Sequence, residues 1–114
     1  ILTAEISKAS FGMTPHEYKK FKRLGKENLR DHMTDLELIF SMLGEASTSE
    51  IERVREPEGF EEHRVASVEG GVVAKNAREE LEDKTGERVI SKGNFLSEEQ
   101  KGVKMKNKKW VVGG

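Results

Sequence analysis

The stretch TDLELIFSMLG, residues 34–44, decides the fold that this sequence predicts. Thr34, followed three residues later by Glu37, is the capping-box pattern of a helix start. Behind it, apolar side chains recur at intervals of three and four, the period of one helix face: Leu36, Ile39, Phe40 and Leu43, with Leu38 and Met42 beside them. So many apolar positions leave little of this helix for water, and we expect it at the centre of the core. We expect Gly44 to end or kink it.

Three further helices are expected around this one. The sequence TPHE, residues 14–17, combines a second capping box with proline at the first helical position, and we expect Gly25 to stop that helix. The sequence STSE, residues 47–50, can start a short helix through Arg55, which Pro57 closes. The last helix, from about Gly59 to Lys84 with its C-cap at Thr85-Gly86, carries small and apolar residues on one stripe: Ala66, Gly70, Val73, Ala77 and Leu81.

The predicted fold class is therefore all-α, a small domain of about four helices with flexible ends, because no strand pattern is long enough to build a sheet. Residues 1–13 are expected to be a connector with at most one helical turn, and residues 14–96 the helical domain. Residues 97–114 are expected to be a disordered, lysine-rich tail that could add a flexible phosphate contact. It contains five lysines followed by one tryptophan: Lys101, Lys104, Lys106, Lys108, Lys109 and Trp110.

Composition excludes several classes of protein. The chain has 114 residues, enough for one modest core, and no cysteine, which excludes disulfides and thiolate chemistry. No apolar run is long enough for a membrane span or signal-peptide core. These features fit the reducing cytoplasm and predict no membrane partner. The formal net charge is −1, so an argument for nucleic-acid binding must rest on a local cluster of positive charge. The chain begins with isoleucine, which suggests a piece of a longer protein.

The local asymmetry is a basic segment that begins in the helix after residue 14. Six cations fall within twelve residues, with Glu27 as the opposing charge: Lys19, Lys20, Lys22, Arg23, Lys26 and Arg30. Such a face can collect phosphates, and Tyr18 or Phe21 could stack on bases if they are exposed. The alternative is an ordinary solvated surface, with both aromatic rings in the core. We carry the six cations forward as candidate contacts with nucleic acid or a partner.

No residue pattern supports an enzyme. Asp31 and His32 could be drawn as a carboxylate–imidazole pair, but adjacent residues do not normally face each other, and no nucleophile is specified. We expect Asp31, His32 and Thr34 to form a structural joint between two helices. Histidine spacing and carboxylate pattern match no metal site, and the Gly70-Gly71 pair lacks the residues of a phosphate loop. No catalytic residue, metal or cofactor is therefore expected.

Gly70 and Gly71 lie inside the last expected helix, where each costs roughly 1 kcal/mol relative to alanine. Three explanations remain open: a helix break, a close approach of another backbone, or a hinge.

Several separated segments resemble one known family. They are KASFGMTPHEYKKFK (8–22), KxLxKxxLxDHMTDLEL (22–38), LIFSMLGEASTSEI (38–51) and EGGVVAKNAREELEDKTGERVIS (69–91). In this order and spacing they resemble the C-terminal region of the bacterial and prophage DNA-damage-inducible protein D family. The resemblance covers about residues 1–96. Relatives typically have Lys-Lys where this chain has Gly25-Lys26, which shortens the expected helix.

The resemblance implies a non-enzymatic module of the bacterial DNA-damage (SOS) response. Such proteins are associated with the recombinase filament on single-stranded DNA, and they commonly carry an N-terminal BRO-type, antirepressor-like domain. The first functional hypothesis is therefore binding of a recombinase filament or single-stranded DNA through the basic segment. The alternative is an oligomerisation or scaffold module, a homodimer for instance, in which the stripe of small residues is partly an interface.

Overall fold

The computed structural model describes residues 2–93, which form four α-helices, one short 3-10 helix and no strand. The helices are α1 (Thr3–Phe11), α2 (Pro15–Phe21), η1 (Leu29–His32), α3 (Asp35–Arg55) and α4 (Gly59–Thr85). The all-α prediction is confirmed. The expected tail at residues 97–114 lies outside the described residues. Among the described helices, none is both long and apolar enough to cross a membrane.

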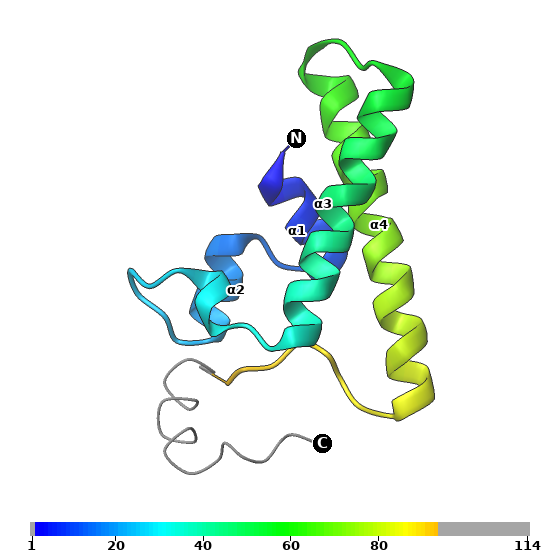
Figure 1. Cartoon of the computed structure of the whole chain (residues 1–114). Coiled ribbons are helices and arrows are strands. Elements are labelled where there is room, and N and C mark those ends of the chain that lie inside the picture. Colours follow the sequence, from blue (N-terminus) through cyan, green and yellow to red (C-terminus); the bar gives the residue numbers. More distant parts are fainter. Residues whose placement is uncertain (1, 94–114) are drawn as a thin grey trace.

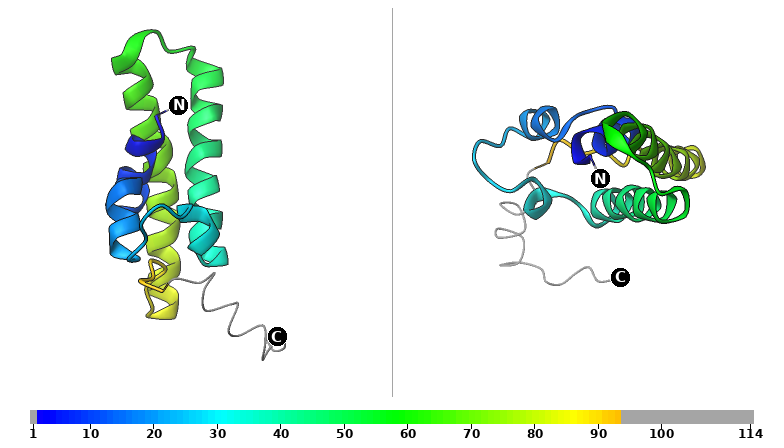
Figure 2. Two further views of the ribbon diagram at one scale, coloured as in Figure 1. Left: turned by 90° about the vertical axis from the view of Figure 1, so that its left-hand side faces the viewer. Right: turned by 90° about the horizontal axis from the view of Figure 1, so that it is seen from above.

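The two longest helices, α3 and α4, form an antiparallel hairpin, and α1 lies along one side of it (Figures 1 and 2). α2 and η1 sit beside the lower half of this hairpin. After α4 the chain turns back, so that residues 87–93 run under the start of α3 toward α2. We call residues 89–93 the strap.

Both predicted capping boxes are present. Thr14 Oγ1 accepts a hydrogen bond from Glu17 N, and the Glu17 carboxylate accepts one from Thr14 N. The pair Thr34 and Glu37 repeats this arrangement at the start of α3. Gly86, at φ 76°, caps α4 as expected. Local sequence signals thus locate three of the helix ends.

The first thirteen residues are not a connector. Residues 3–11 form the nine-residue helix α1, which Gly12 ends in the left-handed conformation. Its buried side, with Ile6 and Ser10, packs where α3 and α4 each present a glycine. The expectation of at most one turn was wrong because tertiary packing, and not local periodicity, stabilises this short helix.

Gly44 does not end the central helix, and the separate helix expected at residues 47–55 is part of α3. A Cβ at Gly44 would lie 2.9 Å from both Ile6 Cγ2 and Ser10 Oγ. The glycine therefore makes room for α1, while the helical ladder continues past it. Thr48, an expected helix start, instead donates its hydroxyl to Gly44 O at 2.8 Å.

α2 ends at Phe21, four residues before the expected stop at Gly25. Leu24 N donates to Lys19 O at 2.8 Å and Arg23 N to Lys20 O at 3.0 Å, the two bonds of a Schellman motif. Arg23 occupies the left-handed position of this motif at φ 64°. Leu24 is buried directly after it, so the turn is fixed by an apolar contact as well as by hydrogen bonds.

The core is centred on one end of the hairpin and not along all of α3. Its buried members come from α1, α2, the residue after η1, α3 and the strap: Phe11, Tyr18, Met33, Phe40 and Val89. From α4, the partly buried Ala77 and Leu81 pack against them. Phe11 and Tyr18 meet edge to face at 5.2 Å between ring centroids. Against expectation, Leu36, Ile39 and Met42 are 42%, 54% and 57% exposed. The reason is that α1 covers only one side of the hairpin, so much of α3 faces water.

Candidate functional site

The predicted basic segment divides into three groups in the structure. Lys20, Arg23 and Lys26 are exposed and Lys19 is half-buried, all on α2 or the turn after it. Among the described residues, none of these four cations forms an ion pair, whereas most arginines elsewhere do. We call Lys19, Lys20, Arg23 and Lys26 the basic face.

Lys22 does not belong to this face, although it was predicted with it. Its side chain is excluded from solvent, and its Nζ lies 3.0 Å from Glu37 Oε1. The same ammonium donates to Ser91 O at 2.7 Å and to Gly93 O at 3.0 Å. Lys22 points inward because its position follows the last turn of α2, where the chain reverses toward the core. It is a structural cation and cannot reach a phosphate in this conformation.

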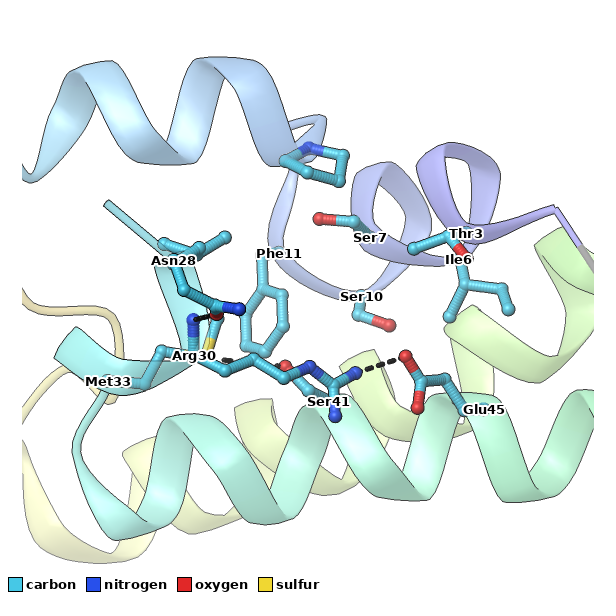
Figure 3. A pocket seen from close by; sticks show the side chains of 12 residues that line it. Thr3, Ile6, Ser7, Ser10, Phe11, Asn28, Arg30, Met33, Ser41 and Glu45 are labelled. Carbon is cyan, nitrogen blue, oxygen red and sulfur yellow. Dashed lines mark hydrogen bonds and ion pairs between the residues drawn. The ribbon is translucent and has the colours of Figure 1, made fainter. Parts of the chain in front are cut away.

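Arg30 also lies apart from the basic face. It belongs to η1 and forms an ion pair with Glu45 of α3. Its guanidinium therefore already has one carboxylate partner, and it lies over a pocket (Figure 3).

The two aromatic residues of α2 are not a stacking platform. Tyr18 is completely buried, and its hydroxyl donates to Glu37 Oε2. Burial, reinforced by this hydrogen bond to a carboxylate, raises the pKa of Tyr18 well above its usual value. Phe21 is half-buried, with Lys92 Nζ 5.7 Å from its ring centroid. Lys92 comes from the strap, so an exposed cation remote in sequence lies next to α2. Sequence reasoning did not include Lys92, because nothing in the local pattern places the strap there.

Glu27 reduces the positive charge close to the basic face. Its Oε1 accepts a hydrogen bond from Gly25 N at 2.6 Å. Hydrogen bonds from the backbone of Glu27 and Gly25 lower the pKa of the Glu27 carboxyl, which therefore stays ionised. The basic face consequently presents four cations with one carboxylate beside them.

The three residues of the predicted joint, Asp31, His32 and Thr34, take different places in the structure. Asp31 and His32 lie in η1; Asp31 is exposed and His32 is buried. Thr34 caps α3. The residue that caps η1 is Asn28, whose Oδ1 accepts from Arg30 N at 2.9 Å, and it was not among the expected residues. An Asn preceding a short turn is a recognisable signal that could have identified it.

The Gly70-Gly71 pair is a packing site. A Cβ at Gly70 would lie 1.9 Å from Thr48 Oγ1 and 2.6 Å from Thr48 N, and a Cβ at Gly71 would lie 2.7 Å from Ile6 O. α4 continues unbroken through both residues. Of the three explanations, close approach of two other helices is the one that the geometry supports. The stripe of small residues is thus occupied largely by α3 and α1, which removes most of it from any interface between chains.

One pocket of about 260 Å³ lies between α1, η1 and α3 (Figure 3). Phe11, Ile6 and Met33 supply its apolar lining, and Arg30 and Glu45 meet across it. Three serines also line it: Ser7, Ser10 and Ser41. Arg30, one of the predicted contact residues, thus lies at the rim of a concave site.

The described part of the chain holds no group of three or more histidine or acidic side chains that could bind a metal ion. Comparison with known proteins finds no matching family model, no matching curated protein and no matching solved structure. The site must therefore be judged on its own geometry.

Proposed function

We propose that this domain is a non-enzymatic module that binds single-stranded DNA, bare or within a recombinase filament, through the basic face. The observation that carries the proposal is the clustering of Lys19, Lys20, Arg23 and Lys26 on one short segment without ion-pair partners among the described residues. Unpaired cations attract phosphates, and their association releases counterions.

The resemblance to DNA-damage-inducible protein D supports the same proposal, together with a bacterial cytoplasmic setting and the DNA-damage response. It also favours a BRO-type domain in the parent protein. Buried Tyr18 leaves the face without a free aromatic platform on α2. Binding is therefore expected to be mainly electrostatic, with little preference for base sequence.

The test is fluorescence anisotropy of a labelled single-stranded oligonucleotide at several salt concentrations. We expect saturable binding whose log affinity falls with log salt by roughly 0.7 per phosphate contact. Lys20→Ala and Lys26→Ala should each reduce that slope. Matched controls are Lys75→Ala and Lys84→Ala, exposed lysines of α4 that pair with Glu79 and Glu80. No binding at low salt, or equal losses in both sets of variants, contradicts the proposal.

A second candidate function is self-association through the hairpin. The observation that favours it is the exposure of large apolar side chains on α3 and α4, among them Ile39, Met42 and Val73. Exposed apolar area of this kind is typical of protein interfaces. Sedimentation over a range of protein concentrations tests it. A dimer that Ile39→Glu disrupts, and that the lysine variants leave intact, would favour assembly. A monomer at all concentrations would exclude it.

A further inference from the structure

The pocket under Arg30 has the features of a small-molecule site, independently of the basic face. Residues of α1, α2, η1 and α3 line it, and its volume of about 260 Å³ is larger than the roughly 150 Å³ of an apolar cavity that holds benzene. Its lining combines the Phe11 ring, the Met33 thioether and the Ile6 side chain. Such a lining favours a compact apolar body, and an aromatic ring fits the surface that phenylalanine and methionine offer.

Arg30 and Ser41 are two of the polar residues at the pocket that have bonding capacity left among the described residues. The Arg30 guanidinium uses Nη2 for Glu45 Oε2 and makes no other side-chain hydrogen bond. Ser41 Oγ donates only to Met33 Sδ, at 3.7 Å, and a thioether is a weak acceptor. By contrast, Ser7 Oγ donates to Met13 O at 2.7 Å and Ser10 Oγ to Gly71 O at 3.3 Å. Arg30 and Ser41 are therefore among the groups that a ligand can use.

We propose that this pocket binds a small aromatic or branched apolar carboxylic acid, with its apolar body on Phe11 and Met33 and its carboxylate on the Arg30 guanidinium. A guanidinium has five donors in a planar fork that matches a carboxylate. Glu45 holds this fork over the pocket in the free protein and competes with the ligand for it. Glu45 is thus a positioning residue whose charge limits affinity.

The experiment is a titration of the isotope-labelled full chain with benzoate, followed by amide chemical shifts. We expect saturable shifts confined to the pocket, including Ser10, Phe11 and Ser41, with an affinity in the millimolar range. Benzyl alcohol has the same ring without the charge and should bind about tenfold more weakly, because it lacks the charge-assisted hydrogen bonds. Benzylamine, with the opposite charge, should not shift these amides.

Two variants examine the role of Arg30 in opposite directions. Arg30→Met should weaken benzoate binding about tenfold while leaving benzyl alcohol unchanged. Glu45→Gln removes the competing carboxylate and should strengthen benzoate binding several-fold, an effect that a merely structural ion pair would not produce. The control is Arg53→Met. This change breaks an exposed ion pair between Arg53 and Glu50 on α3, the helix that also carries Glu45.

The benzoate results test the pocket whether or not the domain binds DNA. The proposal would be overturned if benzoate at concentrations up to about 20 mM produced no saturable shifts, because a dissociation constant above that value is weak even for a site of this size. Equal affinity for benzoate and benzyl alcohol, or weaker benzoate binding by Glu45→Gln, would overturn it as well. If Arg30→Met loses its native spectrum, the Glu45→Gln result decides alone. Loss of DNA binding on the basic face would leave these results unaffected.

Discussion

Lys22 Nζ lies 3.0 Å from Glu37 Oε1, and both side chains are completely excluded from solvent. The Glu37 carboxylate also accepts hydrogen bonds from Tyr18 Oη, from Thr34 N at 2.8 Å and from Ser91 N at 3.0 Å. Four donors from three segments, α2 with its C-cap, the start of α3 and the strap, thus converge on one buried anion. A buried ion pair is costly to desolvate, and this network of hydrogen bonds offsets the cost.

Removing one partner of this pair should destabilise the fold strongly. Lys22→Met leaves the Glu37 charge buried without its cation, which typically costs about 3–5 kcal/mol. Chemical denaturation of the purified chain measures the loss. The double variant Lys22→Met/Glu37→Gln should be less destabilised than the sum of its single variants, because neither charge is then left alone.

Arg53→Met is the control for the buried pair. It breaks an exposed ion pair on α3 and should cost less than about 1 kcal/mol. If Lys22→Met proved no more destabilising than Arg53→Met, the buried pair would not stabilise the fold as described.

Tyr18 should make the protein sensitive to alkaline pH. Its pKa is raised in the folded state, so the folded chain retains a proton that the unfolded chain loses above about pH 10. The contribution of Tyr18 to the free energy of unfolding is therefore constant below that pH. Above it, this contribution decreases by at most about 1.4 kcal/mol per pH unit.

Tyr18 is the chain's one tyrosine, so tyrosinate absorbance reports it directly. We expect the absorbance to rise only as the protein unfolds at high pH. The matched variant Tyr18→Phe should lack this part of the pH dependence. A tyrosinate signal near pH 10 in the folded protein would refute the buried hydroxyl.

Gly70→Ala should destabilise the hairpin although alanine is the better helix former. The gain in helix propensity is about 1 kcal/mol, but the added methyl would overlap with Thr48, including its backbone, at a typical cost of 1–3 kcal/mol or more. Thermal unfolding of Gly70→Ala, compared with Asn76→Ala at an exposed site on the same helix, tests this. The control should be neutral or slightly stabilising. A stabilised Gly70→Ala variant would show that the helices can separate at no cost.

Arg23→Gly should stabilise the fold and weaken DNA binding at once. Arg23 pays the cost of a left-handed conformation, and glycine at this place in a Schellman motif should gain about 0.5–1 kcal/mol. The same change removes one cation from the basic face. Denaturation and anisotropy on the same sample separate the two effects, so weaker binding could not be attributed to unfolding. Unchanged DNA affinity would exclude Arg23 from the interface.

The sequence allowed prediction of those features that depend on neighbouring residues. The two capping boxes, the end of α4 at Gly86 and the all-α class follow from short local signals. What failed depends on residues far apart in the chain. α1 is stabilised by Gly44 and Gly71, and the contact of Gly44 with Ile6 is not visible in the sequence, where a glycine after an apolar helical pattern predicts a helix end or a kink.

The candidate site divides in the same way. The clustering of cations around α2 was predictable from sequence. Lys22 and Arg30, however, do not belong to the basic face, because each pairs with a carboxylate 15 residues further along the chain, Glu37 and Glu45 respectively. Charge counting cannot distinguish a cation that faces water from one that turns inward at a helix end. The pocket was not predictable, because residues from four separate elements form it without a recognisable motif.

The convergence on Glu37 has a consequence for how this domain can evolve. A change at that position simultaneously alters the start of α3, the docking of α2 and the anchoring of the strap. Lys22, Tyr18 and Glu37 are therefore expected to be inherited together or replaced together across related sequences. The exposed lysines of the basic face are under no such joint constraint and can be replaced one at a time.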